Sequence, residues 1–245
     1  MTIRKTILDS AAEVAQFAAS AVVADLSAAI AEYGNATWVI AGGSTPSQAY
    51  KLLAEQNGSK VDWSLVTVLI GDERCVPYSS PDSSWKSAAE LFLSHVPIPS
   101  DQLLRPIETT DAEEAAVDYA SKLKSLPTVA NGAPRLDHVW IGMGEDGHTL
   151  SLFPGHPSYE DTDARVIPVH NSPKPPPDRI SLTRRGLEGV GTCLVLSTGS
   201  GKAEAVARAL NGDTTLPVAG VAEHISKSGG IAHWVLDSAA ASQAQ

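Results

Sequence analysis

Cysteine is almost absent from this sequence, and its scarcity excludes two kinds of small stabilised fold. The 245 residues include two cysteines, Cys75 and Cys193, which lie far apart in the chain. Two cysteines provide neither a disulfide framework nor the four ligands of a structural zinc site. We therefore expect both thiols to be reduced.

Positive charge is also scarce. Lysine and arginine together number 18 against 28 aspartates and glutamates, which gives a net charge of -10. Proteins that bind nucleic acid or anionic membranes usually present a basic patch. We therefore expect neither a nucleic acid nor a membrane as partner. Any anionic substrate must be held by a few local cations and backbone amides.

Long apolar runs are lacking as well. By inspection, no apolar run approaches the ~20 residues that a membrane-spanning helix requires. Residues 11–31 mix Ala and Val with polar residues such as Glu13 and Asp25, and the amino terminus has no signal-peptide hydrophobic segment. The expected location is the cytoplasm.

The apolar residues that are present indicate an α/β fold. They make up 43% of the chain, enough for a large core at this length. Strand and helix periodicities alternate, as they do in a mostly parallel sheet flanked by helices on both faces. We expect one α/β domain over residues 1–245, with room for a small appended lobe.

Several elements can be placed from local signals. Ser10 and Glu13 form a capping box that begins a long helix, which Gly34 ends. Strands are predicted at 37–41, 65–70, 136–141, 192–197 and 231–236, with a weaker one at 164–169 that contains Pro168. Further helices are predicted at 46–55, 84–93, 111–124 and 202–210.

The first of these strands runs into the loop AGGSTP at 41–46. Gly42 and Gly43 let backbone amides approach a ligand, Ser44 and Thr45 offer hydroxyls, and the loop opens onto a helix amino end, which favours anions. No Gly-Lys-Ser/Thr closes it, so it is not a Walker loop. A plain turn capped by Ser44 or Thr45 is the alternative.

The second strand is followed by charged residues in the segment GDER at 71–74. Charges that follow a buried strand closely usually pair with each other or with a ligand. The planar guanidinium of Arg74 suits a phosphate or carboxylate. A structural ion pair between Asp72 and Arg74 is the alternative.

The most informative segment follows the third strand and reads VWIGMGEDGHTLSLFP at 139–154. Gly142, Gly144 and Gly147 match the spacing of a dinucleotide-binding fingerprint, but no helix opens at the last glycine, so we do not expect such a site. Asp146 and His148 instead form an ionisable pair where open α/β sheets bind ligands. The alternative is that His148 only stabilises its loop.

Two more cations complete the set of candidate residues. Lys202 begins a predicted helix, where the helix dipole disfavours a cation unless an anion is bound nearby. The alternative is that Lys202 is an exposed helix residue without a role in binding. Arg179 follows the proline run at 173–177, so that a stiff loop would deliver it over a cleft.

Taken in order, these segments resemble the motifs of the 6-phosphogluconolactonases. The resemblance covers nearly the whole chain through AGGSTP at 41–46, LIGDERCVP at 69–77, the helix at 84–93, VWIGMGEDGHTLSLFP at 139–154, PPDRISLT at 176–183 and TGSGKAEAV at 198–206. It implies a Rossmann-like fold of the sugar-phosphate isomerase type. It also implies hydrolysis of 6-phospho-D-glucono-1,5-lactone, a phosphosugar lactone, to 6-phosphogluconate without metal or other cofactor.

The resemblance also suggests roles for the candidate residues. His148 would take a proton from the attacking water, and Asp146 would orient the imidazole or favour its charged form. Arg74, Arg179 and Lys202 would bind the 6-phosphate or stabilise the oxyanion, with the division between them left open. The loop at 42–45 and Asp72 would complete the substrate site. For the oligomeric state, a monomer or small homo-oligomer is expected.

Two other functions remain as alternatives. Glucosamine-6-phosphate deaminases are similar in fold, but there a glutamate follows the histidine by five positions, where this chain has Phe153. A non-catalytic sugar-phosphate sensor that regulates a partner is the other alternative. No segment resembles a DNA-binding module, which disfavours this alternative. In one respect the chain departs from the lactonase pattern, because Ser84 stands where the family commonly has asparagine.

Overall fold

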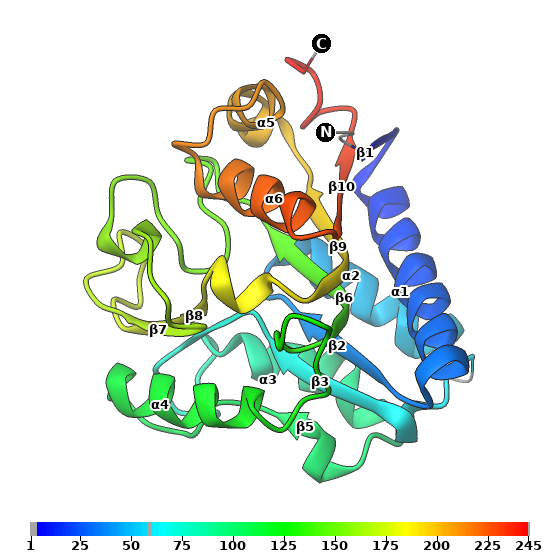
Figure 1. Cartoon of the computed structure of the whole chain (residues 1–245). Helices are drawn as coiled ribbons and strands as arrows, with labels where there is room; N and C mark the ends of the chain where they lie inside the picture. The colour runs from blue at the N-terminus through cyan, green and yellow to red at the C-terminus, as the bar shows by residue number, and fades with distance from the viewer. Residues whose placement is uncertain (1–3, 58–59, 245) are drawn as a thin grey trace.

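The chain forms a seven-stranded parallel sheet with a second, three-stranded antiparallel sheet beside it. This computed structural model describes residues 4–57 and 60–244. The large sheet has the strand order β1-β10-β9-β6-β2-β3-β5, and the small one the order β4-β8-β7 (Figure 1). The predicted α/β class with a mostly parallel sheet is therefore confirmed. The prediction of a single domain was not tested and stays a prediction.

The strands of the large sheet are β1 (Arg4–Leu8), β2 (Ala36–Ile40), β3 (Val66–Ile70), β5 (Leu103–Leu104), β6 (Leu136–Gly142), β9 (Val190–Ser197) and β10 (Ile231–Asp237). Those of the small sheet are β4 (Asp72–Arg74), β7 (Val166–Val169) and β8 (Arg179–Leu182). The α-helices are α1 (Ala11–Tyr33), α2 (Ser44–Leu52), α3 (Ser84–Leu91), α4 (Ala112–Leu123), α5 (Ala203–Leu210) and α6 (Pro217–Lys227).

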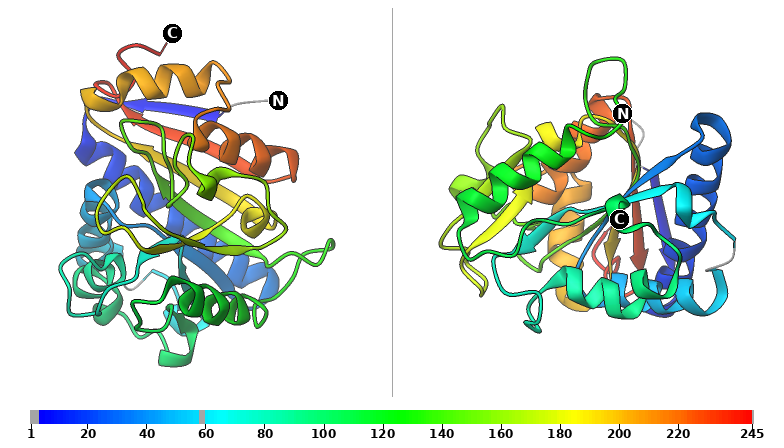
Figure 2. Two further views of the ribbon diagram at one scale, coloured as in Figure 1. Left: turned by 90° about the vertical axis from the view of Figure 1, so that its left-hand side faces the viewer. Right: turned by 90° about the horizontal axis from the view of Figure 1, so that it is seen from below.

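Helices cover both faces of the large sheet, as predicted. Helices α1 and α2 lie on one face, whereas α5, α6 and the small sheet lie on the other (Figure 2). The ends of α1 also agree with the sequence signals. The Ser10 hydroxyl accepts a hydrogen bond from the Glu13 amide, and Gly34 ends the helix in the left-handed conformation at φ 78°.

Helix α1 corrects one prediction. By length and composition it could cross a membrane, so the statement that no such segment is present was wrong. The polar residues within it are too few to bring its mean hydropathy below that of a membrane-spanning helix. In this structure one side of the helix is buried against the sheet, as expected of a core helix. The buried residues are Val14, Ala15, Ala18, Ala19, Val22, Leu26 and Ala29.

The weak strand predicted at 164–169 belongs to the small sheet and not to the parallel one. Strand β7 pairs with β8 in antiparallel fashion, and Pro168 lies opposite Ile180. Because β7 is an edge strand, it tolerates a proline, which cannot donate a hydrogen bond to a neighbouring strand. The sequence did not predict β1, β4, β5, β8 or α6.

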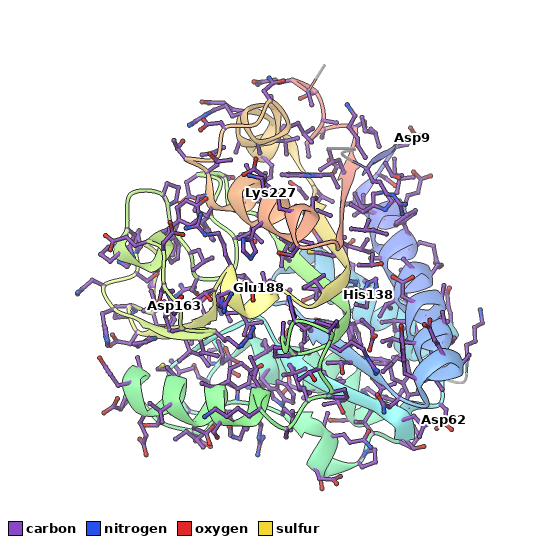
Figure 3. All side chains as sticks on the ribbon, in the orientation of Figure 1. Asp9, Asp62, His138, Asp163, Glu188 and Lys227 are labelled. Atoms are coloured by element: carbon purple, nitrogen blue, oxygen red, sulfur yellow. The ribbon has the colours of Figure 1, made fainter. Side chains whose placement is uncertain are left out.

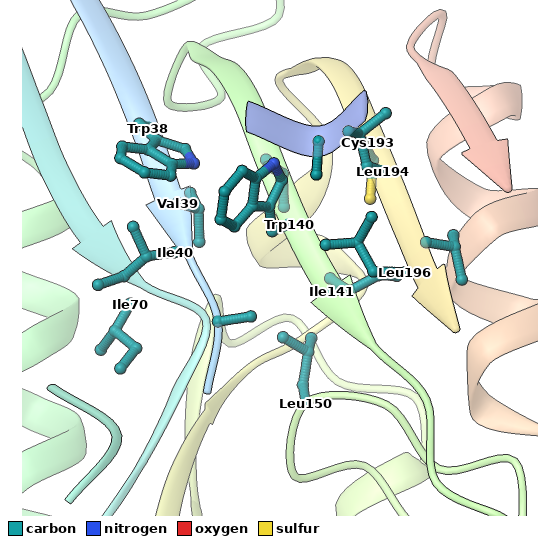
Figure 4. Packing of buried hydrophobic residues seen from close by; sticks show 14 of the residues in the cluster. Trp38, Val39, Ile40, Ile70, Trp140, Ile141, Leu150, Cys193, Leu194 and Leu196 are labelled. Carbon is teal, nitrogen blue, oxygen red and sulfur yellow. The ribbon is translucent and has the colours of Figure 1, made fainter. Parts of the chain in front are cut away.

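Aromatic side chains from adjacent strands fill the core. The rings of Trp38 on β2 and Trp140 on β6 are fully buried and meet edge to face at 4.9 Å (Figure 4). His138, also on β6 and labelled in Figure 3, contacts the Trp140 ring at 6.3 Å, centroid to centroid. Its Nδ1 lies 2.7 Å from a carboxylate oxygen of Asp25, and the Trp140 indole donates to its Nε2. This buried histidine ties α1 to the sheet and is structural.

Candidate functional site

The candidate site is a pocket at the carboxyl edge of the parallel sheet. Strands β9, β6, β2 and β3 lie side by side, and the chain leaves β2 towards β3 but later returns to β6 on the other side. Open α/β sheets bind ligands at such a reversal of strand order. The pocket has a volume of about 240 Å³. It is lined by residues 41–46, Asp72, Arg74, Ser84, 142–144, 148–150, Arg179, 196–198 and Lys202.

His148 faces this pocket with its orientation fixed by Asp146. Nδ1 of His148 lies 2.5 Å from Oδ1 of Asp146, and the backbone amide of His148 donates to the same carboxylate. Since a carboxylate only accepts hydrogen bonds, Nδ1 is the donor in this contact, and the neutral form of the ring then has its lone pair on Nε2. Partial burial is the largest single influence on Asp146 and opposes its ionisation, but the hydrogen bonds and the charge of His148 together outweigh it and lower the pKa of that carboxyl.

Two neighbouring residues shape the surroundings of the pair. A Cβ atom on Gly144 would collide with the His148 ring and the Asp146 carboxylate, so glycine is required there. The fully buried ring of Phe153 lies 4.7 Å from the imidazole, centroid to centroid. An apolar ring therefore occupies the position at which deaminases carry a glutamate.

The loop after β2 presents an uncapped helix end to the pocket. Helix α2 begins at Ser44 with Gly43 as its N-cap residue, and no side chain caps it. The alternative of a turn capped by Ser44 or Thr45 is therefore wrong. The Thr45 hydroxyl instead lies 2.9 Å from that of Thr198. Free amides at a helix amino end form an anion site.

Strand β4 sends its charged residues in two directions. Asp72 and Arg74 line the pocket, and they form no direct ion pair with each other. Glu73 points away and accepts hydrogen bonds from the backbone amides of Arg74, Ser84 and Trp85. Burial raises the pKa of Glu73 in spite of these donors. Glu73 thus secures the start of α3.

The resemblance to the lactonases leads us to expect asparagine at position 84, where this chain has serine. The side chain of Ser84 lies directly against Gly42, where a Cβ atom would collide with it. Ser84 also lines the pocket. The departure from the family pattern therefore falls at the edge of the site, next to the glycine loop.

Arg179 reaches the pocket from strand β8 and not from a loop over a cleft, so that part of the prediction was wrong. Only 3% of its surface is exposed. Its guanidinium donates to the carbonyl oxygens of Lys174, Pro175 and Pro176, so the proline run holds the side chain from behind. Burial lowers the pKa of Arg179, and the charge of Arg74 acts in the same direction.

Lys202 approaches from the short 3₁₀ turn that precedes α5. Its ammonium group donates to the Met143 carbonyl oxygen at 2.6 Å, close to the His148 loop. Burial lowers the pKa of Lys202. The alternative of an exposed helix residue does not hold, because the side chain is half-buried and lines the pocket.

The comparison with protein families agrees with this geometry. Residues 9–230 match the family described as glucosamine-6-phosphate isomerases/6-phosphogluconolactonase. The chain belongs to this family. The match spans all the segments that line the pocket, from the loop after β2 to Lys202.

Three members of the family show how far the similarity extends. A probable 6-phosphogluconolactonase 4, chloroplastic, from Oryza sativa subsp. indica is 41% identical over 200 residues, 78% of this chain and 62% of the relative. The 6-phosphogluconolactonase of Streptomyces coelicolor is 36% identical over 94% of this chain and 90% of its own. The crystal structure of 6-phosphogluconolactonase from Leishmania guyanensis superimposes with a TM-score of 0.86 at 25% identity, covering 98% of both chains.

The pocket brings together the predicted residues of this family member. All of them line it except Asp146, which lies behind His148. Two pocket residues were not predicted, namely Ser197, the last residue of β9, and Thr198, which follows it. The end of a predicted strand was the signal that could have found them. Cys75 does not line the pocket, and burial raises the pKa of its thiol to about 12.

Proposed function

We propose that this chain hydrolyses 6-phospho-D-glucono-1,5-lactone to 6-phosphogluconate. The observation that carries the proposal is the orientation of His148, whose Nδ1 is held by Asp146 while the ring lines a pocket with three cations. Because the lactone is an activated ester, a general base and an anion-binding site are sufficient to catalyse its hydrolysis. The names of the relatives at 35–41% identity support the same activity.

In the proposed mechanism, Nε2 of His148 accepts a proton from a water molecule that attacks the lactone carbonyl. The resulting imidazolium is stabilised by Asp146, and its proton then passes to the leaving ring oxygen. General base action of this kind contributes about 10² to 10⁴ in rate. Arg74, Arg179 and Lys202 would hold the 6-phosphate or stabilise the oxyanion, together with the amide groups at the start of α2.

Phe153 supports lactone hydrolysis over amino-sugar ring opening. It places an apolar ring against His148, so the second carboxylate of the deaminases is missing. The prediction that no metal or cofactor is needed belongs to this proposal. The cytoplasmic location stays a prediction, since the relatives include proteins named as chloroplastic. The monomer or small homo-oligomer also stays a prediction.

The test is acid release from freshly prepared lactone, measured above spontaneous hydrolysis. His148→Ala should lose the enhancement and still bind 6-phosphogluconate, whereas the control His95→Ala, at an exposed histidine outside the pocket, should keep it. Ammonia release from glucosamine 6-phosphate, assayed in parallel, should not exceed background. Full activity of His148→Ala, or ammonia production, would overturn the proposal.

A further inference from the structure

Ser151 is a buried residue that no step of the proposed mechanism uses. It follows the His148 loop and is completely shielded from solvent. Its backbone amide donates to the hydroxyl of Ser181 on β8, at 3.2 Å. Ser181 in turn lies opposite Asp72 in the β4–β8 pair. The serine is thus fixed next to both strands of the small sheet that reach the pocket.

The hydroxyl of Ser151 lies between two opposite charges. The hydroxyl donates to Oδ2 of Asp72 at 2.6 Å, and Nη1 of Arg179 donates to the Ser151 hydroxyl oxygen at 3.5 Å. Its single proton is therefore committed to the carboxylate, and its lone pairs face the guanidinium. Asp72 and Arg179 both line the pocket, and in the described part of the chain they do not form a direct ion pair.

This separation needs a cause, because opposite charges attract strongly where water is excluded. Among the described residues, the hydrogen bonds of Arg179 go to neutral groups, namely three carbonyl oxygens and the Ser151 hydroxyl, and the Phe153 ring that it also contacts is neutral too. A buried guanidinium without a carboxylate partner is unfavourable unless an anion arrives to balance it. A direct pair with Asp72 would balance it permanently and would weaken the hold on a bound anion.

We propose that Ser151 is a positioning residue that keeps Asp72 and Arg179 apart, so that both remain available to the substrate. The hydrogen bond to Ser151 occupies one oxygen of Asp72 and leaves the other free to accept from a sugar hydroxyl. Arg179 then offers its unbalanced charge to the 6-phosphate. This inference rests on the proposed lactone hydrolysis for its substrate.

Replacing Ser151 by alanine removes the hydroxyl and lets Asp72 and Arg179 pair directly. KM for the lactone should rise about tenfold or more, and kcat should change less, because His148 and Asp146 are untouched. The dissociation constant of 6-phosphogluconate, measured by calorimetry, should rise by a similar factor. The control is Ser226→Ala, whose hydroxyl donates to the Ala222 carbonyl within α6 and lies outside the pocket.

A double-mutant cycle separates positioning from a general loss of packing. In an Asp72→Asn background no carboxylate remains to pair with Arg179, so Ser151→Ala should then change KM and product binding less than twofold. Equal effects of Ser151→Ala in both backgrounds, or an unchanged KM in the single variant, would overturn the inference.

Failure of the proposed lactone hydrolysis can be distinguished from failure of the inference about Ser151. In that case the wild type would not accelerate lactone hydrolysis, and calorimetry with 6-phosphogluconate would still test Ser151 through the same cycle. Absence of binding to the wild type would overturn both proposals.

Discussion

Arg74 on β4 lies directly opposite Arg179 on β8 in the antiparallel pair, and both side chains line the pocket. Like charges directly opposite each other destabilise a sheet. Here the cost is increased by the burial of Arg179 and by the Nε atom of Arg74, which is buried without a hydrogen-bond partner. An anion bound between the two guanidinium groups would offset both penalties.

We therefore expect Arg74→Gln to weaken substrate binding. The loss of a charged hydrogen bond of about 1.5–3 kcal/mol corresponds to a rise in KM of roughly ten- to hundredfold. In the wild type, 6-phosphogluconate at about 100 times its dissociation constant should stabilise the fold by about 2.7 kcal/mol. Steady-state kinetics and thermal unfolding with and without this product measure the two effects.

Arg208→Gln is the matched control for the removal of an arginine. Arg208 on α5 pairs with Asp213, which lies after the helix, and neither residue lines the pocket. It should leave KM and the stabilisation by product unchanged. A KM of Arg74→Gln within twofold of the wild type would contradict an anion site between the two arginines.

Gly144→Ala should disable the Asp146–His148 pair without unfolding the protein. The added methyl group would occupy the space of both side chains, so the imidazole must turn away from its carboxylate. Because general base action is worth about 10² to 10⁴ in rate, kcat should fall by at least about 10². Binding of 6-phosphogluconate and far-UV circular dichroism should change little. A wild-type kcat in this variant would show that the pair is not needed.

The site was predictable as far as it depends on strand ends. The carboxyl ends of parallel strands meet at one edge, so the segments after β2, β3 and β6 could be expected to converge. Asp146 and His148 are also close in sequence, but only the structure shows that the carboxylate reaches the ring. The antiparallel pairing of β4 with β8 was not predictable, because three charged residues carry no strand signal. The position of Arg74 opposite Arg179 depends on that pairing.

The missed elements have similar physical explanations. Strand β1 is short and lies at an edge, so its exposed residues show no apolar alternation. Helix α6 contains Gly220, which lowers helix propensity. The structure shows why glycine stands there, since a Cβ atom would run into the Tyr159 hydroxyl. In both cases tertiary contacts, which a single sequence does not display, override the local preference.

Glu73→Gln should lower the free energy of unfolding by about 2–3 kcal/mol. Both carboxylate oxygens of Glu73 accept from backbone amides, so the amide group of glutamine would set one NH₂ against a backbone N–H in either orientation. Urea unfolding measures the loss. Glu90→Gln, at an exposed ion pair with Lys86, should cost less than about 0.5 kcal/mol. Equal stability of the two variants would contradict this role of Glu73.

The contacts of His170 with two carboxylates should make the stability of the fold depend on pH. Its Nε2 lies 2.8 Å from Glu113 on α4, and its Nδ1 lies 2.9 Å from Asp178, just before β8. The hydrogen bonds to Asp178 and Glu113 raise the pKa of His170 above the ordinary value of 6.5. The charged ring therefore ties the segment that leads to Arg179 onto α4.

A group whose pKa is raised in the folded state stabilises the fold below its unfolded pKa and loses this effect as pH rises through the folded one. His170→Gln, which carries no charge at any pH, should thus be less stable than the wild type at pH about 5.5 and nearly equal to it at pH about 8.5. Since the side chain is 43% exposed, solvent screening keeps the difference below about 1 kcal/mol. Urea unfolding at both pH values measures it. A difference that does not change with pH would show that the contacts act only through neutral hydrogen bonds.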